Sequence, residues 1–317
     1  MIVRRDGEVN TSNERSVVAI GVFDGLHRGH QAVIAQLLEL ARQYDALATV
    51  VTFDPPPASV LAPDRAPLLL GTIDQRLEGL DELHVDQVRV LTFSAELAKE
   101  TADEFIDRVL IQDLHACCVL VGDDFHFGHN REGTVATLRA AGQKDGFDVI
   151  VAPTHGDGDR WSSTAVRRAL ADGDLERAES ILGRHFILRG VVEHGDERGK
   201  ELGFPTANLE IAEDQALPAE GVYAGAVAFD GADWPAAISV GRRPQFYDDG
   251  RLLVEVYVVG FDGNLYGRAL DLVFLARLRA QTTFSNEAEL SAQIGRDVAT
   301  TQQLFDSYSK NRTELLR

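Results

Sequence analysis

Apolar runs alternate with helical patterns through the first half of the chain. Short β-branched runs lie at 17–23, 47–53, 87–93, 117–122 and 147–153. Between the first two runs, apolar residues from Val33 to Tyr44 recur at helical spacing. Strands that alternate with helices indicate a parallel sheet with helices on both faces. We therefore predict an α/β fold for this half.

The pattern changes after residue 183. A helical segment from about Arg167 ends at Gly183, and glycine is a common helix stop. Runs of alternating or continuous β character follow at 187–194, 221–229, 236–241, 251–261 and 269–278, with few helical patterns between them. This predicts an antiparallel β-barrel or sandwich, closed by a helix from about Asn286 to Tyr308. We place two domains at 1–183 and 184–317.

Composition narrows the classes of partner. The 317 residues are enough for two hydrophobic cores, and the formal net charge of −19 argues against a surface that neutralises nucleic-acid phosphates. The N-terminus is polar and no apolar stretch reaches membrane-spanning length, so we expect a cytoplasmic protein without a membrane partner. Adjacent Cys117 and Cys118 lie in an apolar run and are expected to be small buried side chains.

The first candidate site is AIGVFDGLHRGH at residues 19–30, where a strand leads through a glycine-containing turn into a helix. His27 and His30 then lie near a helix N-terminus, which favours anions. Glycines allow backbone N–H groups to approach a phosphate closely, and imidazoles can donate hydrogen bonds to oxygens that gain charge. Two alternatives are a zinc site, for which no third ligand is evident, and a simple helix cap, which leaves the paired histidines unexplained.

The HxGH signature after a βα turn resembles that of the nucleotidylyltransferase superfamily. The longer GVFDGLHRGH is similar to the prokaryotic bifunctional riboflavin kinase/FAD synthetases, and GDDFHFGHNREG (122–133) and RWSSTAVR (160–167) agree with that family. The resemblance implies a Rossmann-like first domain in which an FMN phosphate oxygen attacks the α-phosphorus of ATP, giving FAD and pyrophosphate. The chain departs from the family pattern at His126, where arginine is typical, and at Pro56, where PHP is typical.

The same resemblance implies roles for individual residues of the first domain. His27 and His30 would stabilise the ATP phosphates, and Asp124, Phe125 and Arg131 would contact the flavin or nucleotide. ATP and phosphate contacts would come from Gly21, Phe23, Gly25, Gly29, Ser162, Ser163, Thr164 and Arg167. Without the resemblance, the SST segment is also an ordinary helix N-cap and DDF an ordinary turn.

The second candidate site is HGDERGKELGFPTANL at 194–209, which combines glycines, a lone lysine and PTAN. Thr206 and Asn208 are neutral oxygen donors two residues apart, so in an extended segment they face the same side. A plain surface connection is the alternative. The stretch resembles the riboflavin kinase signature HGxxxGRxLGFPTAN. That resemblance implies magnesium ligands at Thr206 and Asn208, and phosphate contacts at Gly195, Lys200, Gly203 and Pro205.

The segments GVY (221–223), VEVY (254–257) and NLYGR (264–268) extend this resemblance. It implies that Glu255 is the general base for the riboflavin 5′-hydroxyl, with Val254 and Val256 on the opposite face of the strand. A lone strand glutamate that faces solvent is the alternative. The family commonly has an asparagine and PTF where this chain reads SVGRRPQF, so Ser239 and Gln245 put kinase activity in question.

The leading hypothesis is therefore a bifunctional enzyme. Riboflavin and ATP would give FMN and ADP in the barrel, FMN and ATP would give FAD and pyrophosphate in the α/β domain, and both steps would need magnesium. Alternatives are a single-activity FMN adenylyltransferase whose barrel only binds flavin, and a non-catalytic flavin sensor. The expected partners are small-molecule substrates, and a homo-oligomer is left open.

Overall fold

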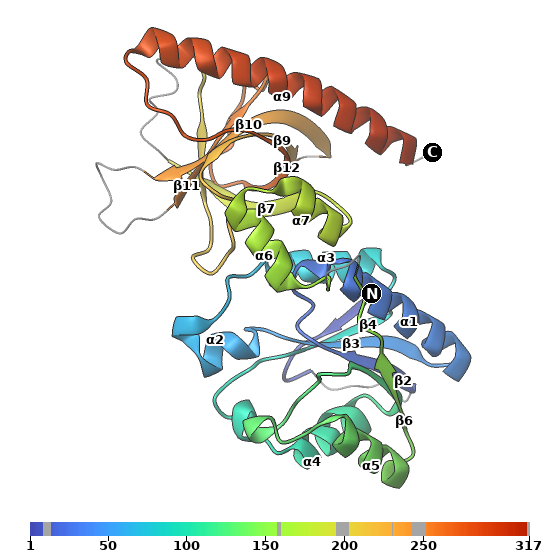
Figure 1. Ribbon diagram of the computed structural model, residues 1–317. Coiled ribbons are helices and arrows are strands. Elements are labelled where there is room, and N and C mark those ends of the chain that lie inside the picture. Colours follow the sequence, from blue (N-terminus) through green and yellow to red (C-terminus); the bar gives the residue numbers. More distant parts are fainter. Residues whose placement is uncertain (9–13, 157–159, 195–202, 230, 243–251, 316–317) are drawn as a thin grey trace. The chain divides into compact units, whose positions relative to one another are not determined.

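The computed structural model describes residues 1–8, 14–156, 160–194, 203–229, 231–242 and 252–315 (Figure 1). They divide into two compact units, Met1–Pro67 with Thr72–Ser162 and Leu68–Gly71 with Ser163–Arg317. The short segment Leu68–Gly71 belongs to the second unit because the main chain of Leu69 pairs with Gln215. The predicted boundary between Gly183 and Arg184 stays a prediction.

The first unit contains a six-stranded, fully parallel sheet, as predicted. Its strands, in spatial order, are β1 (Ile2–Arg4), β4 (Gln87–Leu91), β3 (Leu47–Phe53), β2 (Ser16–Ile20), β5 (Ala116–Gly122) and β6 (Asp148–Ala152). The edge strand β1 was not predicted from the sequence. The order reverses between β2 and β5, and such a switch point is where open α/β sheets bind ligands.

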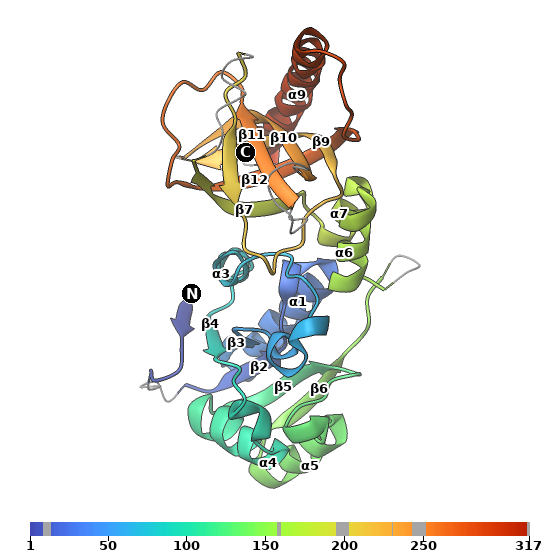
Figure 2. The ribbon, with the colours of Figure 1, turned by 90° about the vertical axis from the view of Figure 1, so that its left-hand side faces the viewer.

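Helices cover both faces of this sheet, as Figure 2 shows. Alternate strand residues such as Val17 and Ala19 form one core with α1 (Arg28–Tyr44) and α3 (Ile73–Glu82). Their neighbours, such as Val18 and Ile20, form a second core with α4 (Ala102–Phe105), the π-helix η4 (Ile106–Asp113) and α5 (Val135–Asp145). Shorter elements are η1 (Asp24–Leu26), α2 (Pro57–Leu61), η2 (Pro63–Arg65), η3 (Leu97–Lys99) and η5 (His129–Arg131).

The second unit contains a closed antiparallel barrel, which decides between the two predicted β architectures. Its strands, in spatial order, are β10 (Ala232–Arg242), β11 (Leu252–Val258), β8 (Ala207–Glu210), β7 (Phe186–Glu193), β12 (Ala269–Arg279) and β9 (Gly221–Phe229). The long helix α9 (Glu287–Leu315) packs against β9, β10 and β12. The predicted single helix before the barrel is two helices, α6 (Ser163–Asp172) and α7 (Leu175–Leu182), because Gly173 adopts a left-handed conformation between them. Among the described residues, no helix is both long and apolar enough to cross a membrane.

Candidate active sites

The turn after β2 brings the two motif histidines to the start of α1. Phe23, Gly25 and Leu26 all have positive φ, at 54°, 76° and 42°. Such conformations are strained for side chains other than glycine and are concentrated at functional sites. They fold residues 21–27 into a compact turn between the buried strand and the helix. Glycine is favoured at position 25 because it adopts a positive φ without strain.

His27 and His30 form a stacked pair at the N-terminus of α1. Their ring centroids are 3.7 Å apart with an interplanar angle of 21°, and the His30 N–H donates to Nδ1 of the N-cap His27 at 3.3 Å. A Cβ on Gly29 would lie 3.0 Å from Cε1 of His27, a tight contact, so a larger residue there would press on that ring. The 17-residue helix adds a positive dipole end, which suits a phosphate.

The two histidines lie in an environment that keeps His30 neutral. Burial lowers the pKa of His30 well below its usual value, and the neighbouring charges of His27 and Arg76 lower it further. Its Nδ1 is buried without a hydrogen-bond partner. A neutral imidazole has one N–H donor, so His30 can offer a hydrogen bond to a phosphate oxygen. The described residues contain no group of three or more His, Cys, Asp or Glu that could hold a metal, so the zinc alternative gains no support there.

A cavity of about 740 Å³, called the aromatic cavity here because five phenylalanines line it, opens at the carboxyl ends of the strands. Ile20, the last residue of β2, lines it immediately before the histidine turn. The rings of Phe125 and Phe127 stack at 5.4 Å, and Phe53 and Phe93 meet edge to face at 5.9 Å. Such walls fit a planar ring system.

The predicted flavin residues divide around this cavity. Phe125 and Arg131 line it, as does His126, the residue that departs from the family pattern. Asp124 is not among the lining residues, and its carboxylate pairs with Arg160 at 3.2 Å. The sequence interpretation missed Phe127, although its position two residues after Phe125 was a signal, because alternate residues of an extended segment share a side.

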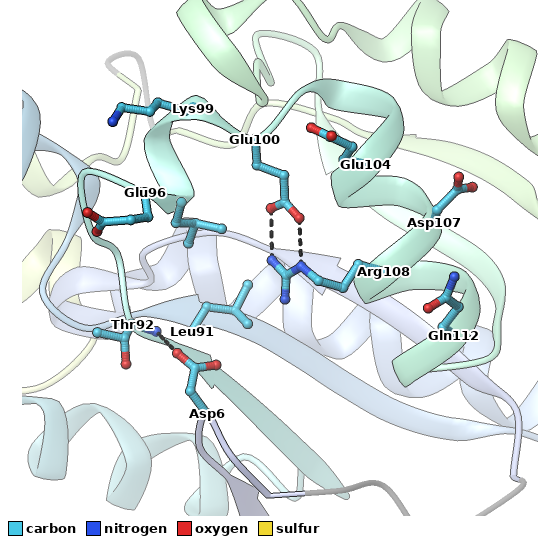
Figure 3. Close-up of a pocket in the computed structure, with 11 residues that line it drawn as sticks. Asp6, Leu91, Thr92, Glu96, Lys99, Glu100, Glu104, Asp107, Arg108 and Gln112 are labelled. Carbon is cyan, nitrogen blue, oxygen red and sulfur yellow. Dashed lines mark hydrogen bonds and ion pairs between the residues drawn. The ribbon is translucent and has the colours of Figure 1, made fainter.

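The cavity rim is held by the segment around η3. The backbone N–H of His129 donates to the Glu100 carbonyl at 2.7 Å. The Glu100 carboxylate accepts two hydrogen bonds from Arg108, at 2.6 and 2.8 Å, as Figure 3 shows by dashed lines. A second cavity has a volume of about 750 Å³. Its lining, drawn in Figure 3, consists mainly of polar and charged side chains such as Glu96 and Asp107. That lining does not suit an apolar ring, so the aromatic cavity is the candidate flavin site.

The SST segment spans the division between the two units. Ser162 is the last residue of the first unit, and Ser163, Thr164 and Arg167 belong to α6 in the second. Within the second unit, Arg167 Nε donates to the main-chain oxygen of Leu68. The SST segment therefore lies at the start of α6, a position that is also expected if its hydroxyls only cap the helix.

A polar row crosses the barrel away from its core. In the strand register, Ser239 of β10 lies opposite Glu255 of β11, and Glu255 lies opposite Asn208 of β8. Directly paired residues share a face of a sheet. Val254 and Val256 are buried on the other face, as predicted, so the Glu255 side chain points away from the core.

A cavity of about 360 Å³ is lined by two members of this row, Ser239 and Glu255. The side-chain amide of Gln281 donates to Ser239 Oγ at 3.0 Å and to the Val240 carbonyl at 3.1 Å. Glu220, which also lines the cavity, is paired with Arg242 at 2.9 Å. Sequence reasoning found Ser239 and Glu255 but not Gln281, which lies beyond β12 and gave no local signal.

The PTAN end of the second motif continues into this row. Gly203, Pro205 and Thr206 immediately precede β8, and the ring of Phe204 packs edge to face on Tyr257 at 5.5 Å. Tyr257 is two residues beyond Glu255 in β11, so it lies on the same face. The predicted phosphate residues Gly195 and Lys200, and Gln245 of SVGRRPQF, lie outside the described residues.

Comparisons with known proteins agree along the chain. The sequence model of the FAD synthetase family matches residues 9–165, and that of riboflavin kinase matches residues 182–305. A bifunctional riboflavin kinase/FMN adenylyltransferase of Pseudomonas fluorescens is 40% identical over 96% of this chain and 97% of its own. The protein of the same name from Escherichia coli strain K12 is 40% identical over 92% of this chain and 93% of its own.

A solved structure supports the fold over the same length. A crystal structure of a protein from Streptococcus pneumoniae, described as a macrolide-efflux protein, has a TM-score of 0.84 and 30% identity, and the match covers 95% of this chain and 99% of that one. The efflux description belongs to that protein alone, and the likeness here is in the succession of an α/β unit and a barrel. With both family models and the full-length relatives in agreement, the chain belongs to the family of bifunctional riboflavin kinase/FMN adenylyltransferases.

Proposed function

We propose that the barrel phosphorylates riboflavin to FMN and that the α/β unit adenylylates FMN to FAD. The observation that carries this proposal is the aromatic cavity of about 740 Å³. Ile20 lines it, and the turn that follows Ile20 leads to the stacked His27 and His30. It offers a planar flavin ring a place next to a turn suited to phosphate. The product of the barrel is the substrate of the α/β unit, which gives one chain a reason to carry both.

In adenylyl transfer, a phosphate oxygen of FMN forms a bond to the α-phosphorus of ATP, and the bond to the departing pyrophosphate breaks. Neutral His30 donates its N–H to phosphate oxygens as charge shifts to the leaving group. His27 caps α1 beside it and acts on the same phosphates. Ser162, Ser163, Thr164 and Arg167 are proposed to bind the triphosphate, and Phe125 and Arg131 to hold the flavin.

In phosphoryl transfer, Glu255 takes the proton of the riboflavin 5′-hydroxyl while that oxygen attacks the γ-phosphorus of ATP and ADP leaves. The register supports this role because Glu255 lies beside Asn208 and Ser239 and within the 360 Å³ cavity. Thr206 and Asn208 carry the hard oxygen donors that magnesium prefers. They would hold the ion, which neutralises phosphate charge when bound. A cytoplasmic location is proposed from the requirement for ATP.

Chromatography of two reaction mixtures tests the proposal. The purified protein is incubated with ATP and magnesium, once with riboflavin and once with FMN, and the flavins are then separated. FAD from both mixtures is the expected result. FAD from FMN alone would reduce the barrel to a flavin-binding role, and no product from either would overturn both assignments.

A further inference from the structure

Arg76 of α3 is a buried cation that the mechanism above does not use. Its side chain is 4% exposed, and its position between Ile73 and Leu80 places it on the apolar side of the helix. A buried charge has a desolvation cost of several kcal/mol by order of magnitude. An apolar side chain at this position would avoid that cost. The contacts of the guanidinium must therefore explain why an arginine is buried here.

Those contacts join two parts of the adenylylation site. Nη1 of Arg76 donates to Thr52 Oγ1 at 3.2 Å and to the Phe53 carbonyl at 3.1 Å. Thr52 Oγ1 in turn donates to the Val22 carbonyl at 3.1 Å. Val22 lies in the turn that leads to the histidines, whereas Phe53 lines the aromatic cavity. One guanidinium therefore holds the end of β3, which carries the cavity-wall residue Phe53 and is tied to the histidine turn through Thr52.

The surrounding charges match this arrangement. Burial lowers the pKa of Arg76, and the carboxylates of Asp24 and Asp54 act in the opposite direction. Asp24 belongs to the histidine turn and is itself buried. The cation also acts on His30, whose pKa it lowers. Arg76 thus interacts electrostatically with a buried carboxylate of the histidine turn and with His30, unlike a charge that only fills space in a core.

We propose that Arg76 is a positioning residue for adenylyl transfer, which holds the histidine turn in register with the wall of the flavin cavity through Thr52 and Phe53. The inference rests on the proposed adenylyltransferase function. A substitution far from the reacting atoms that displaces the site by about 1 Å can lower the rate about 100-fold. Because substrate contacts are not removed, the loss falls on kcat and leaves KM nearly unchanged.

The first test measures kcat and KM for FAD formation in Arg76→Met and Arg76→Lys. We expect Arg76→Met to lose about 10- to 100-fold in kcat, with KM for ATP and FMN within about threefold of wild type. Arg76→Lys keeps the charge and N–H donors, so it should recover most of the loss. Full kcat in a folded Arg76→Met protein would overturn the proposal.

Arg89 provides the matched control. It is 6% exposed, lies in β4 of the same sheet, and binds Asp113 and Asp6 at 2.8 Å each. Arg89→Met should lower the midpoint of thermal unfolding and leave kcat unchanged. An equal kcat loss in Arg76→Met and Arg89→Met would show a general structural effect and overturn the proposal.

Thr52→Val keeps the experiment decisive if Arg76→Met does not fold. Valine preserves the branched shape but removes the hydroxyl that joins Arg76 to Val22, and kcat should fall by about tenfold with FMN formation unchanged. A Thr52→Val protein with wild-type kcat would overturn the relay. Failure of the wild-type protein to make FAD from FMN would instead refute the proposed function, so the two failures are distinguishable.

Discussion

Replacement of Glu255 by glutamine separates the two proposed activities. Glutamine has nearly the same size and shape as glutamate, but its amide cannot accept the proton of the riboflavin hydroxyl. Glu255 lies between buried Val254 and Val256, and its own side chain points away from the barrel core. The substitution therefore removes the proposed base without disturbing the packing of β11.

The structure sets the expected magnitude. A general base contributes about 10²- to 10⁴-fold, which corresponds to about 2.7–5.4 kcal/mol in activation free energy. A substitution outside the core changes the free energy of unfolding by about 0.5 kcal/mol or less, against a total of about 5–15 kcal/mol. Unfolding cannot then account for a 100-fold loss of turnover. The rate of FMN formation reports on the base itself.

The assay follows FMN from riboflavin and FAD from FMN in separate chromatographic time courses. Glu210→Gln is the control, because Glu210 is an exposed carboxylate two residues beyond Asn208 in β8 and does not line the cavity. We expect Glu255→Gln to lose FMN formation and keep FAD formation, and Glu210→Gln to keep both. Riboflavin phosphorylation by Glu255→Gln within about threefold of wild type would exclude Glu255 as the base.

Three further predictions concern the α/β unit. The double substitution of His27 and His30 by alanine should abolish FAD formation and leave FMN formation intact, and loss of both in a folded protein would contradict separate sites. Phe125→Ala removes a stacked cavity wall, so KM for FMN should rise by about tenfold in steady-state kinetics, and an unchanged KM would place the flavin elsewhere. The pKa of His30 is lowered in the folded state, so below pH about 6.5 the unfolded chain binds a proton that the folded protein does not. The free energy of unfolding should therefore decrease below pH about 6.5, by up to about 1.4 kcal/mol per pH unit. Denaturant unfolding at pH 7 and 5.5 should show a smaller loss for His30→Gln than for wild type, and equal losses would refute the assignment.

The sheet of the first unit was predictable because its central strands are largely buried on both faces and appear as short runs rich in apolar and β-branched residues. In β4 this run is interrupted by Gln87 and Arg89. β1 and β8 were not predicted, since they have three and four residues and depend on partners distant in sequence. β1 is fixed by pairing with β4, and β8 by pairing with β7 and β11. Local propensity carries little information about such short strands, whose pairing is tertiary.

The sites show the same division between local and distant information. Alternation along β11 predicts that Glu255 faces away from Val254 and Val256, but only the register places Asn208 and Ser239 beside it. Arg76 did leave a local trace, a charged residue on the apolar side of a helix pattern. That trace could not identify its partners, because Thr52 and Phe53 lie at the end of a strand distant in sequence, and Thr52 links Arg76 to Val22. A charged residue at a core position of a helix is therefore a useful sequence signal for a positioning residue. Which site it positions is known only from the structure, because the fold decides which strand end lies against the charge.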